Sequence, residues 1–391
     1  MRSMRLRPFL SLPCAAVLLL TLGLLLSFTF AAPHPLDDHF FYQKFTESLA
    51  AGHLDLRIPG FHGSDLLAAV WHLVSRSPIS QIEFQILAAL LIPFAAFFAG
   101  RALYTSEEDA LILACILSMM PFILFVGLRG WTGPAYMCFM LLSIACIRRF
   151  PAVAGLCLAL AILTKPFAIA LLPLLLAMQP MHKKRLLLLS LGLPVLYFAV
   201  QYLQAGQILV GAHSGYNQFS VWQGPERILL NLAHSLQILF SVHNYYFADP
   251  ALTGPGNLMH TSPLLVFLGL FVFLHPKEGG QPVPLRKELF LGAVLGIGLN
   301  VPLDHMDHFY MQAGILCFIL AAVPLLRLYP LWIPLVLATL HFQWFYFYLQ
   351  YRQVFLLDAF FFAVPLTTDF LFLCFCFLRR GKIWNLIRSS L

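Results

Sequence analysis

Long apolar runs separated by short polar breaks dominate the chain. The runs lie near residues 9–31, 82–103, 110–127, 134–147, 151–163, 167–179, 186–203, 262–275, 289–303, 310–326, 331–349 and 359–378. A helix of about 20 apolar residues crosses the hydrocarbon core of a bilayer, and it satisfies its own backbone polar groups there. The pattern predicts an all-α polytopic membrane protein with about 11–12 transmembrane helices, forming one transmembrane domain over residues 1–391.

The fifth and sixth runs are short and meet at Thr164-Lys165-Pro166. A proline removes a backbone donor and disfavours helix in the residue before it, so the helix must break there. Either two short spans form a hairpin or one helix is kinked; the sequence leaves both readings open.

Composition agrees with a lipid-facing surface. Of the 391 residues, 60% are hydrophobic and only 10% are charged, whereas soluble domains are about 25% charged. The net charge of +7 does not indicate nucleic acid, because the basic residues punctuate the apolar runs and form no patch interleaved with exposed aromatic residues. Membrane lipids are the expected surroundings, and no nucleic acid partner is expected.

The positions of the basic residues predict the topology. If the N-terminus is cytoplasmic, 17 of the 24 lysines and arginines fall at inner ends of spans and 7 at outer ends. Cytoplasmic loops carry this excess in membrane proteins, so we expect both termini in the cytoplasm. Thr29-Phe30-Ala31 weakly resembles a signal-peptidase site, but the first apolar run is long for a signal peptide, and we favour an uncleaved first span.

Two predicted outer segments are longer than a turn: the first extracytoplasmic loop, 32–81, and the second, 204–261. The first opens with Asp37 and Asp38, and Phe41, Phe45 and Leu49 then recur every four residues. This spacing predicts a short amphipathic helix that ends at Gly52. A carboxylate at its start can accept a proton from a hydroxyl, or it can cap the helix, and the two aspartates can divide these roles.

Two cations lie at predicted outer breaks. Lys165 is placed to bind a lipid phosphate at the junction of two short spans, although a lone lysine also snorkels without function. Arg129 lies in the tight segment Gly127–Pro134; an interfacial turn is the simpler reading there.

Four ionisable side chains lie within five positions just before a span: Asp304, His305, Asp307 and His308. They could hold a divalent metal, line a phosphate or sugar pocket, or simply make the loop polar. We assign no metal and no cofactor; neither a P-loop nor a GxGxxG segment is present. Asp369 falls inside the last span, where an acid marks a structural pair or a transport pathway.

Four segments together resemble the GT-C superfamily of membrane glycosyltransferases, which includes the protein O-mannosyltransferases and the lipid A aminoarabinose transferases. They are Leu36 to Tyr42 with its continuation to Leu56, Gly155 to Pro173 around Leu163-Thr164-Lys165-Pro166, Leu229 to Leu265, and His308-Phe309-Tyr310. The chain departs from the family in lacking a large soluble C-terminal domain and in having His308 where an arginine is common.

The resemblance implies a polyprenyl-phosphate-linked sugar as donor and a lipid, glycan or protein hydroxyl as acceptor, with transfer by inversion. Asp38 or Asp37 would be the base. Lys165, with Arg129 and His308, would bind the donor phosphate, and the substrate pocket would take in His39, Tyr42, Asp304, His305 and Asp307. The enzyme would be a multi-pass protein of a bacterial inner membrane with its active site on the extracytoplasmic side.

Two other classes remain at this point. A transporter or lipid flippase would use Asp369 and Lys165 as intramembrane charges, and an assembly factor would have no catalysis. The spans show no evident repeat and the polar residues concentrate in outer loops, which favours the enzyme.

Overall fold

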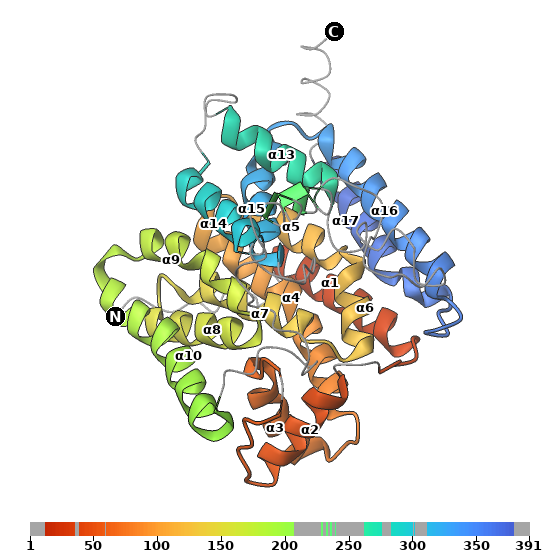
Figure 1. Ribbon diagram of the computed structural model, residues 1–391. Helices are drawn as coiled ribbons and strands as arrows, with labels where there is room; N and C mark the ends of the chain where they lie inside the picture. Colours follow the sequence, from red (N-terminus) through yellow and green to blue (C-terminus); the bar gives the residue numbers. More distant parts are fainter. Residues whose placement is uncertain are drawn as a thin grey trace, which may run out of the picture.

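The computed structural model describes residues 12–35, 39–58, 60–206, 262–275, 283–299, 301 and 311–378, together with a few single positions between 228 and 239. Every regular element in these ranges is a helix, so the all-α prediction is confirmed. The helices form one bundle, with α2 and α3 together at one end and α13 at the other (Figure 1).

The helices follow the predicted runs closely. They are α1 (Leu12–Thr29), α2 (His39–Ala50), α3 (Gly63–Ser75), α4 (Ser80–Leu103), α5 (Glu107–Ser118), α6 (Pro121–Arg129), α7 (Gly133–Cys146), α8 (Pro151–Thr164), η1 (Pro166–Leu171), α9 (Leu172–Met178), η2 (Pro180–His182), α10 (Lys183–Ala205), α13 (Pro263–Leu274), α14 (Arg286–Gly298), α15 (Gln312–Leu328), α16 (Trp332–Tyr351), η4 (Ala359–Phe362) and α17 (Ala363–Leu378).

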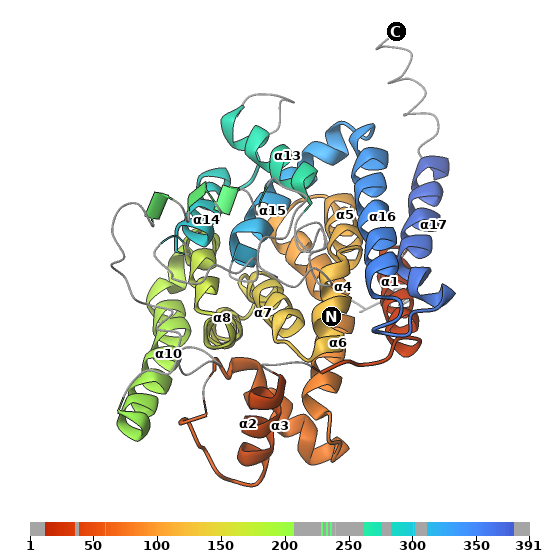
Figure 2. The same ribbon diagram turned by 45° about the vertical axis from the view of Figure 1, so that its right-hand side comes forward.

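Among these residues, four helical stretches are long and apolar enough to cross a membrane alone: Leu12–Thr29, Ser80–Leu103, Pro180–Ala205 and Ala359–Phe377. The α5–α6 pair, bent by 47°, makes a fifth. Five shorter apolar helices also belong to the bundle, as do α14 and α16. Two of them, α7 and α15, are buried along most of their length and lie in the middle of the bundle in both views (Figures 1 and 2). The chain is a multi-pass membrane protein.

The prediction of one continuous span over 110–127 is wrong, because the helix is broken between Ser118 and Pro121. Pro121 has no N–H to donate and starts the new helix at its first position. The Met119 carbonyl at the break accepts a hydrogen bond of 2.6 Å from the buried Trp344 indole. Irregular backbone at this depth is tolerated where protein surrounds and satisfies it.

The break at Lys165 is a hairpin and not a kink. The residue has extended backbone, with φ −152° and ψ 116°, and a 3-10 turn follows it. At the far end of α9, the Gln179 side chain donates a 3.2 Å hydrogen bond to the Ile147 carbonyl, just before α8. The chain after Lys165 therefore returns alongside α8, which settles the alternative left open by the sequence.

The first loop is helical, as predicted, and α2 ends just before Gly52, whose φ is +85°. A second loop helix, α3, was not predicted. Its apolar residues are partly exposed, and its N-terminal turn is buried, so its position depends on packing that the local pattern does not reveal. In Figure 2 both loop helices lie beyond the ends of α6, α7 and α8.

Candidate active site

A small apolar core holds the first loop on the bundle. Phe45 of α2 packs with Leu56 and Ile58 from the segment that follows it, and Tyr197 and Val200 of α10 cover them. The end of α10 also binds loop backbone: Gln204 accepts from the Leu56 amide at 3.0 Å. The loop therefore has a fixed place relative to the spans.

A fully buried polar cluster reinforces that placement. Asp65 lies 2.6 Å from Nδ1 of His62, and its other oxygen accepts from Ser64 at 3.0 Å and from Gln81 of α4 at 2.9 Å. Burial raises the pKa of Asp65, opposed by these hydrogen bonds and by His62. All four side chains are inaccessible to solvent, and His62 stacks on Phe45 with 3.8 Å between ring centroids. The cluster joins α2, α3 and α4.

Gly63 brings the first loop against the Lys165 break. A Cβ on Gly63 would lie 2.5 Å from the Thr164 amide nitrogen and closer still to the Leu160 carbonyl. Only a glycine permits this approach of the α3 N-terminus to the end of α8. Lys165 is the next residue along the chain; it is half-buried, and its carbonyl accepts from the Ala168 amide at 3.1 Å.

The chain on both sides of the acidic pair lies against the Arg129 turn. On one side, the His34 amide donates a 2.9 Å hydrogen bond to the Leu128 carbonyl. On the other, the ring of His39 fills the space where a Cβ of Gly130 would be. Gly130 has φ +73°, so it closes α6 in the left-handed conformation and leaves room for the histidine.

Arg129 is an interior residue of that turn. Its side chain is 3% exposed, and its guanidinium lies over two rings, 4.5 Å from the centroid of Phe125 and 5.3 Å from that of Trp131. A cation at the C-terminus of α6 also complements the helix dipole. The tight turn is confirmed, because Arg129 ends α6 and Gly130 turns the chain. The two flanks of the acidic segment contact the residues on either side of Arg129, Leu128 and Gly130.

His39 and Tyr42, both predicted to line the substrate pocket, are buried. Burial lowers the pKa of His39 to about 4, partly offset by the charge of Glu47, so this ring is neutral at physiological pH. Its Nδ1 has no hydrogen-bond partner among the described residues. Tyr42 meets His62 edge-on at 6.2 Å between centroids. In this structure both side chains pack the loop.

The other predicted site residues fall outside the described ranges. They are Asp37, Asp38, Asp304, His305, Asp307 and His308. Within the residues that the structure describes, no three His, Cys, Asp or Glu side chains gather as a metal site; the Asp304–His308 segment is not covered by that search.

The sequence reasoning missed His62, Asp65 and Gln81. The sequence does contain a signal for a hydrogen-bonded His–Asp pair, because the two residue types stand three positions apart at a helix start, in His62-Gly-Ser-Asp65. The contribution of Gln81 depends on how α3 meets α4 and leaves no such signal.

Asp369 makes a structural pair. Its carboxylate lies 2.9 Å from Nε2 of His341 on α16, whose Nδ1 is 2.7 Å from the Leu337 carbonyl. Both side chains are about one third exposed or more. The pair joins α16 to α17 on the edge of the bundle seen at the right of Figure 1.

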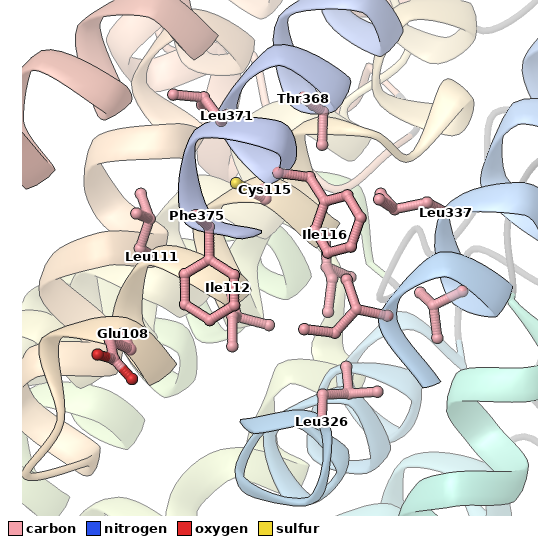
Figure 3. A pocket seen from close by; sticks show the side chains of 13 residues that line it. Glu108, Leu111, Ile112, Cys115, Ile116, Leu326, Leu337, Thr368, Leu371 and Phe375 are labelled. Carbon is pink, nitrogen blue, oxygen red and sulfur yellow. The ribbon is translucent and has the colours of Figure 1, made fainter. Parts of the chain in front are cut away.

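An apolar pocket of about 90 Å³ lies away from the first loop, between α5, α15, α16 and α17. Figure 3 shows side chains such as Ile112, Leu337 and Phe375 pointing toward one another, with Glu108 at the edge. None of the predicted site residues lines it.

The comparisons with known proteins place the fold. No family model and no curated protein matches the chain. A solved structure, ArnT from Cupriavidus metallidurans bound to undecaprenyl phosphate, matches with a TM-score of 0.53 and 16% sequence identity. The match covers 84% of this chain and 63% of that one, so the chain spans less than two thirds of the length of ArnT. The chain therefore has a fold similar to that of ArnT.

Proposed function

We propose that this protein is a glycosyltransferase that takes a sugar from a polyprenyl-phosphate-linked donor and transfers it to an acceptor hydroxyl outside the cytoplasm. The observation that carries the proposal is the position of the first loop. It contacts both cation-bearing breaks of an ArnT-like bundle, at Gly130 beside Arg129 and at Thr164 beside Lys165. ArnT was solved with undecaprenyl phosphate bound, which supports a lipid phosphate as the group recognised here.

The proposed mechanism uses one carboxylate and the nearby cations. Asp38 or Asp37 accepts the proton of the acceptor hydroxyl, whose oxygen attacks the anomeric carbon as the bond to the phosphate oxygen breaks. Attack from the face opposite the leaving group inverts the centre, through an oxocarbenium-like transition state. The lipid phosphate leaves as an anion, and Lys165 offsets its charge together with Arg129 and His308.

The site has to face away from the cytoplasm if the positive-inside assignment holds, with both termini on the cytoplasmic side. A bacterial inner membrane is the proposed location, because its outer leaflet presents lipid-linked sugars to extracytoplasmic acceptors. The lipid carrier then supplies the activated sugar at a site that has no access to nucleotide sugars.

The test is donor turnover by the full-length protein in nanodiscs. Undecaprenyl-phosphate-linked hexoses and aminosugars are offered as a panel of donors together with lipid, glycan and peptide acceptors that bear free hydroxyls, and release of undecaprenyl phosphate is measured. Asp37→Asn and Asp38→Asn keep the size of the side chain and remove the base, and we expect at least one to lower the rate about a hundredfold or more. Asp358→Asn is the matched control, because Asp358 is exposed and caps the Phe360 amide. Full activity in both acidic-pair variants would refute the mechanism.

A lipid flippase or transporter is the second candidate, favoured by the half-exposed His341–Asp369 pair. Movement of a fluorescent lipid-linked sugar across proteoliposomes, abolished by Asp369→Asn and unaffected by Asp38→Asn, would favour transport over transfer.

A further inference from the structure

A hollow of about 630 Å³ opens at the end of α2 that is farther from the Arg129 turn. Residues 52–55 line it, together with Ser48, Arg57 and Gln204. The lining comes from the first loop and from the last turn of α10, and it includes none of the residues assigned above to the base or the donor phosphate.

The chemistry of this hollow suits neutral hydroxyl groups. Asp55 and Arg57 form a bidentate ion pair, with Nε–Oδ1 2.8 Å and Nη2–Oδ2 3.1 Å. The pair cancels its own charge, and the hydrogen bond from Arg57 lowers the pKa of Asp55. Planar carboxylate, guanidinium, imidazole and amide groups provide both donors and acceptors for the hydroxyls of a sugar, while a lining without net charge gives little attraction to an anion.

The hollow is already held in shape. Gln204 donates to the Leu54 carbonyl and accepts from the Leu56 amide. Ser48 donates to the His53 carbonyl at 2.9 Å. Gly52 has φ +85° and nothing within 4 Å of a Cβ position, so the backbone there is open to a ligand. A preformed site loses less conformational entropy on binding.

The position of the hollow limits what it binds. Ser48, which lines the hollow, follows His39 by nine residues along α2, a rise of about 14 Å at 1.5 Å per residue. A ligand group here is therefore remote from a hydroxyl that reacts beside the acidic pair. The polar lining also excludes the polyprenyl chain of a donor.

We propose that this hollow binds a sugar residue of an oligosaccharide acceptor, several sugar residues away from the hydroxyl that receives the transferred sugar. The inference rests on the proposed function and extends it to the acceptor. Binding at a distance from the base positions the reacting end of the acceptor and leaves the groups around the base free for catalysis.

The experiment measures binding of maltohexaose, cellohexaose and chitohexaose to the full-length protein in nanodiscs, by saturation-transfer NMR and titration. The double variant Asp55→Asn with Arg57→Gln keeps the net charge and removes the charged hydrogen-bonding groups. We expect binding of the hexasaccharide that the wild type prefers to weaken about tenfold or more, since hydrogen bonds to charged groups are stronger than those to neutral groups. Val74→Ala, on the exposed face of α3 and outside the hollow, is the matched control and should bind as the wild type does.

Donor turnover by the wild type is measured in a separate experiment. A failure of the proposed function can therefore be told apart from a failure of the acceptor site. Absence of undecaprenyl phosphate release from every donor refutes the proposed function. Release with no hexasaccharide bound, or with equal binding by wild type and double variant, overturns the acceptor site. Release together with selective loss of binding in the double variant supports it, and the KM for the hexasaccharide should then rise by the same factor.

Discussion

The two ends of the bundle differ in where their polar side chains lie and in what these side chains contact. At the loop end, formed by α2, α3 and the breaks beside Arg129 and Lys165, polar side chains are buried and joined by hydrogen bonds between distant segments. At the opposite end, the ion pair between the partly exposed Arg327 and the buried Asp109 joins the end of α15 to the start of α5, and the cavity between the helices is apolar. Buried polar groups are expensive unless fully paired, so their concentration at the loop end indicates where a defined geometry is required.

The largest effect is expected at the Asp65 cluster. Asp65→Ala leaves His62, Ser64 and Gln81 without their shared acceptor inside the protein. Removing one partner of such a buried group costs about 3–5 kcal/mol. Hydrogen exchange measured by mass spectrometry should show α2 and α3 losing protection while α15 keeps it. Asp65→Asn keeps an acceptor oxygen and should lose less; equal protection in all three proteins would mean that the cluster does not hold the loop.

Acid should loosen the loop end next. His39 has a pKa of about 4 in the folded protein against 6.5 in the unfolded chain, so only the unfolded state takes up a proton between these values. The stabilisation is complete above pH 6.5 and is lost as the pH falls toward 4, amounting to about 3 kcal/mol at most. Loop protection followed from pH 7 to 4 should fall in the wild type.

The control for that titration is His39→Gln, which has no proton to gain. Its loop protection should not fall over the same window, since the raised pKa of Asp65 favours the folded loop at lower pH. A wild-type profile that does not fall either would contradict the assignment of a buried neutral imidazole.

Gly63→Ala should have a smaller but local effect. The added methyl group meets the backbone of Leu160 and Thr164, and overpacking of this kind costs about 1–3 kcal/mol. Donor turnover and loop protection should both decrease. Gly192→Ala is the matched control, because its Cβ would meet only the Leu188 side chain at 3.8 Å; comparable losses in both variants would remove the special role of the α3–α8 contact.

The smallest effect is expected in the apolar pocket. Cys115→Leu replaces a sulfur atom of the lining with three carbon atoms, which should change stability by about 1 kcal/mol or less and leave donor turnover within about twofold of wild type. A severe loss of turnover with an intact fold would show that this end also takes part in the reaction, and the contrast between the two ends would fail.

Much of the fold is readable from the sequence because long apolar runs form helices and polar or proline-containing breaks end them. Each predicted apolar run contains helix, although 110–127 is divided between α5 and α6 and only four helical stretches, or five with that pair, are long and apolar enough to span a membrane. Gly52 follows the end of α2 as the pattern predicts. The break at Pro121 was overlooked, although proline is its physical cause. Helix α3 was missed because its buried side consists of small and polar residues, which pack on α2, α4 and α8, while most of its large apolar side chains are exposed.

The candidate site is predictable only in part. Lys165 and Arg129 were found from their positions at breaks, yet the contacts that join the loop to them depend on Gly63 and Gly130, whose role is to leave space. A missing side chain gives no chemical signal in one sequence. In the same way, Asp369 indicated a partner, but His341 could be identified only once α16 and α17 were placed side by side.

The central claim is that the loop end recognises a lipid phosphate through the Lys165 break. Its most direct test is equilibrium binding of undecaprenyl phosphate to the full-length protein in nanodiscs, for the wild type, Lys165→Gln and the control Lys44→Gln, which alters an exposed lysine on α2. Loss of a charge-assisted contact should weaken binding about tenfold in Lys165→Gln and leave Lys44→Gln unchanged. Equal affinity in all three proteins, or no binding by the wild type, would contradict the account.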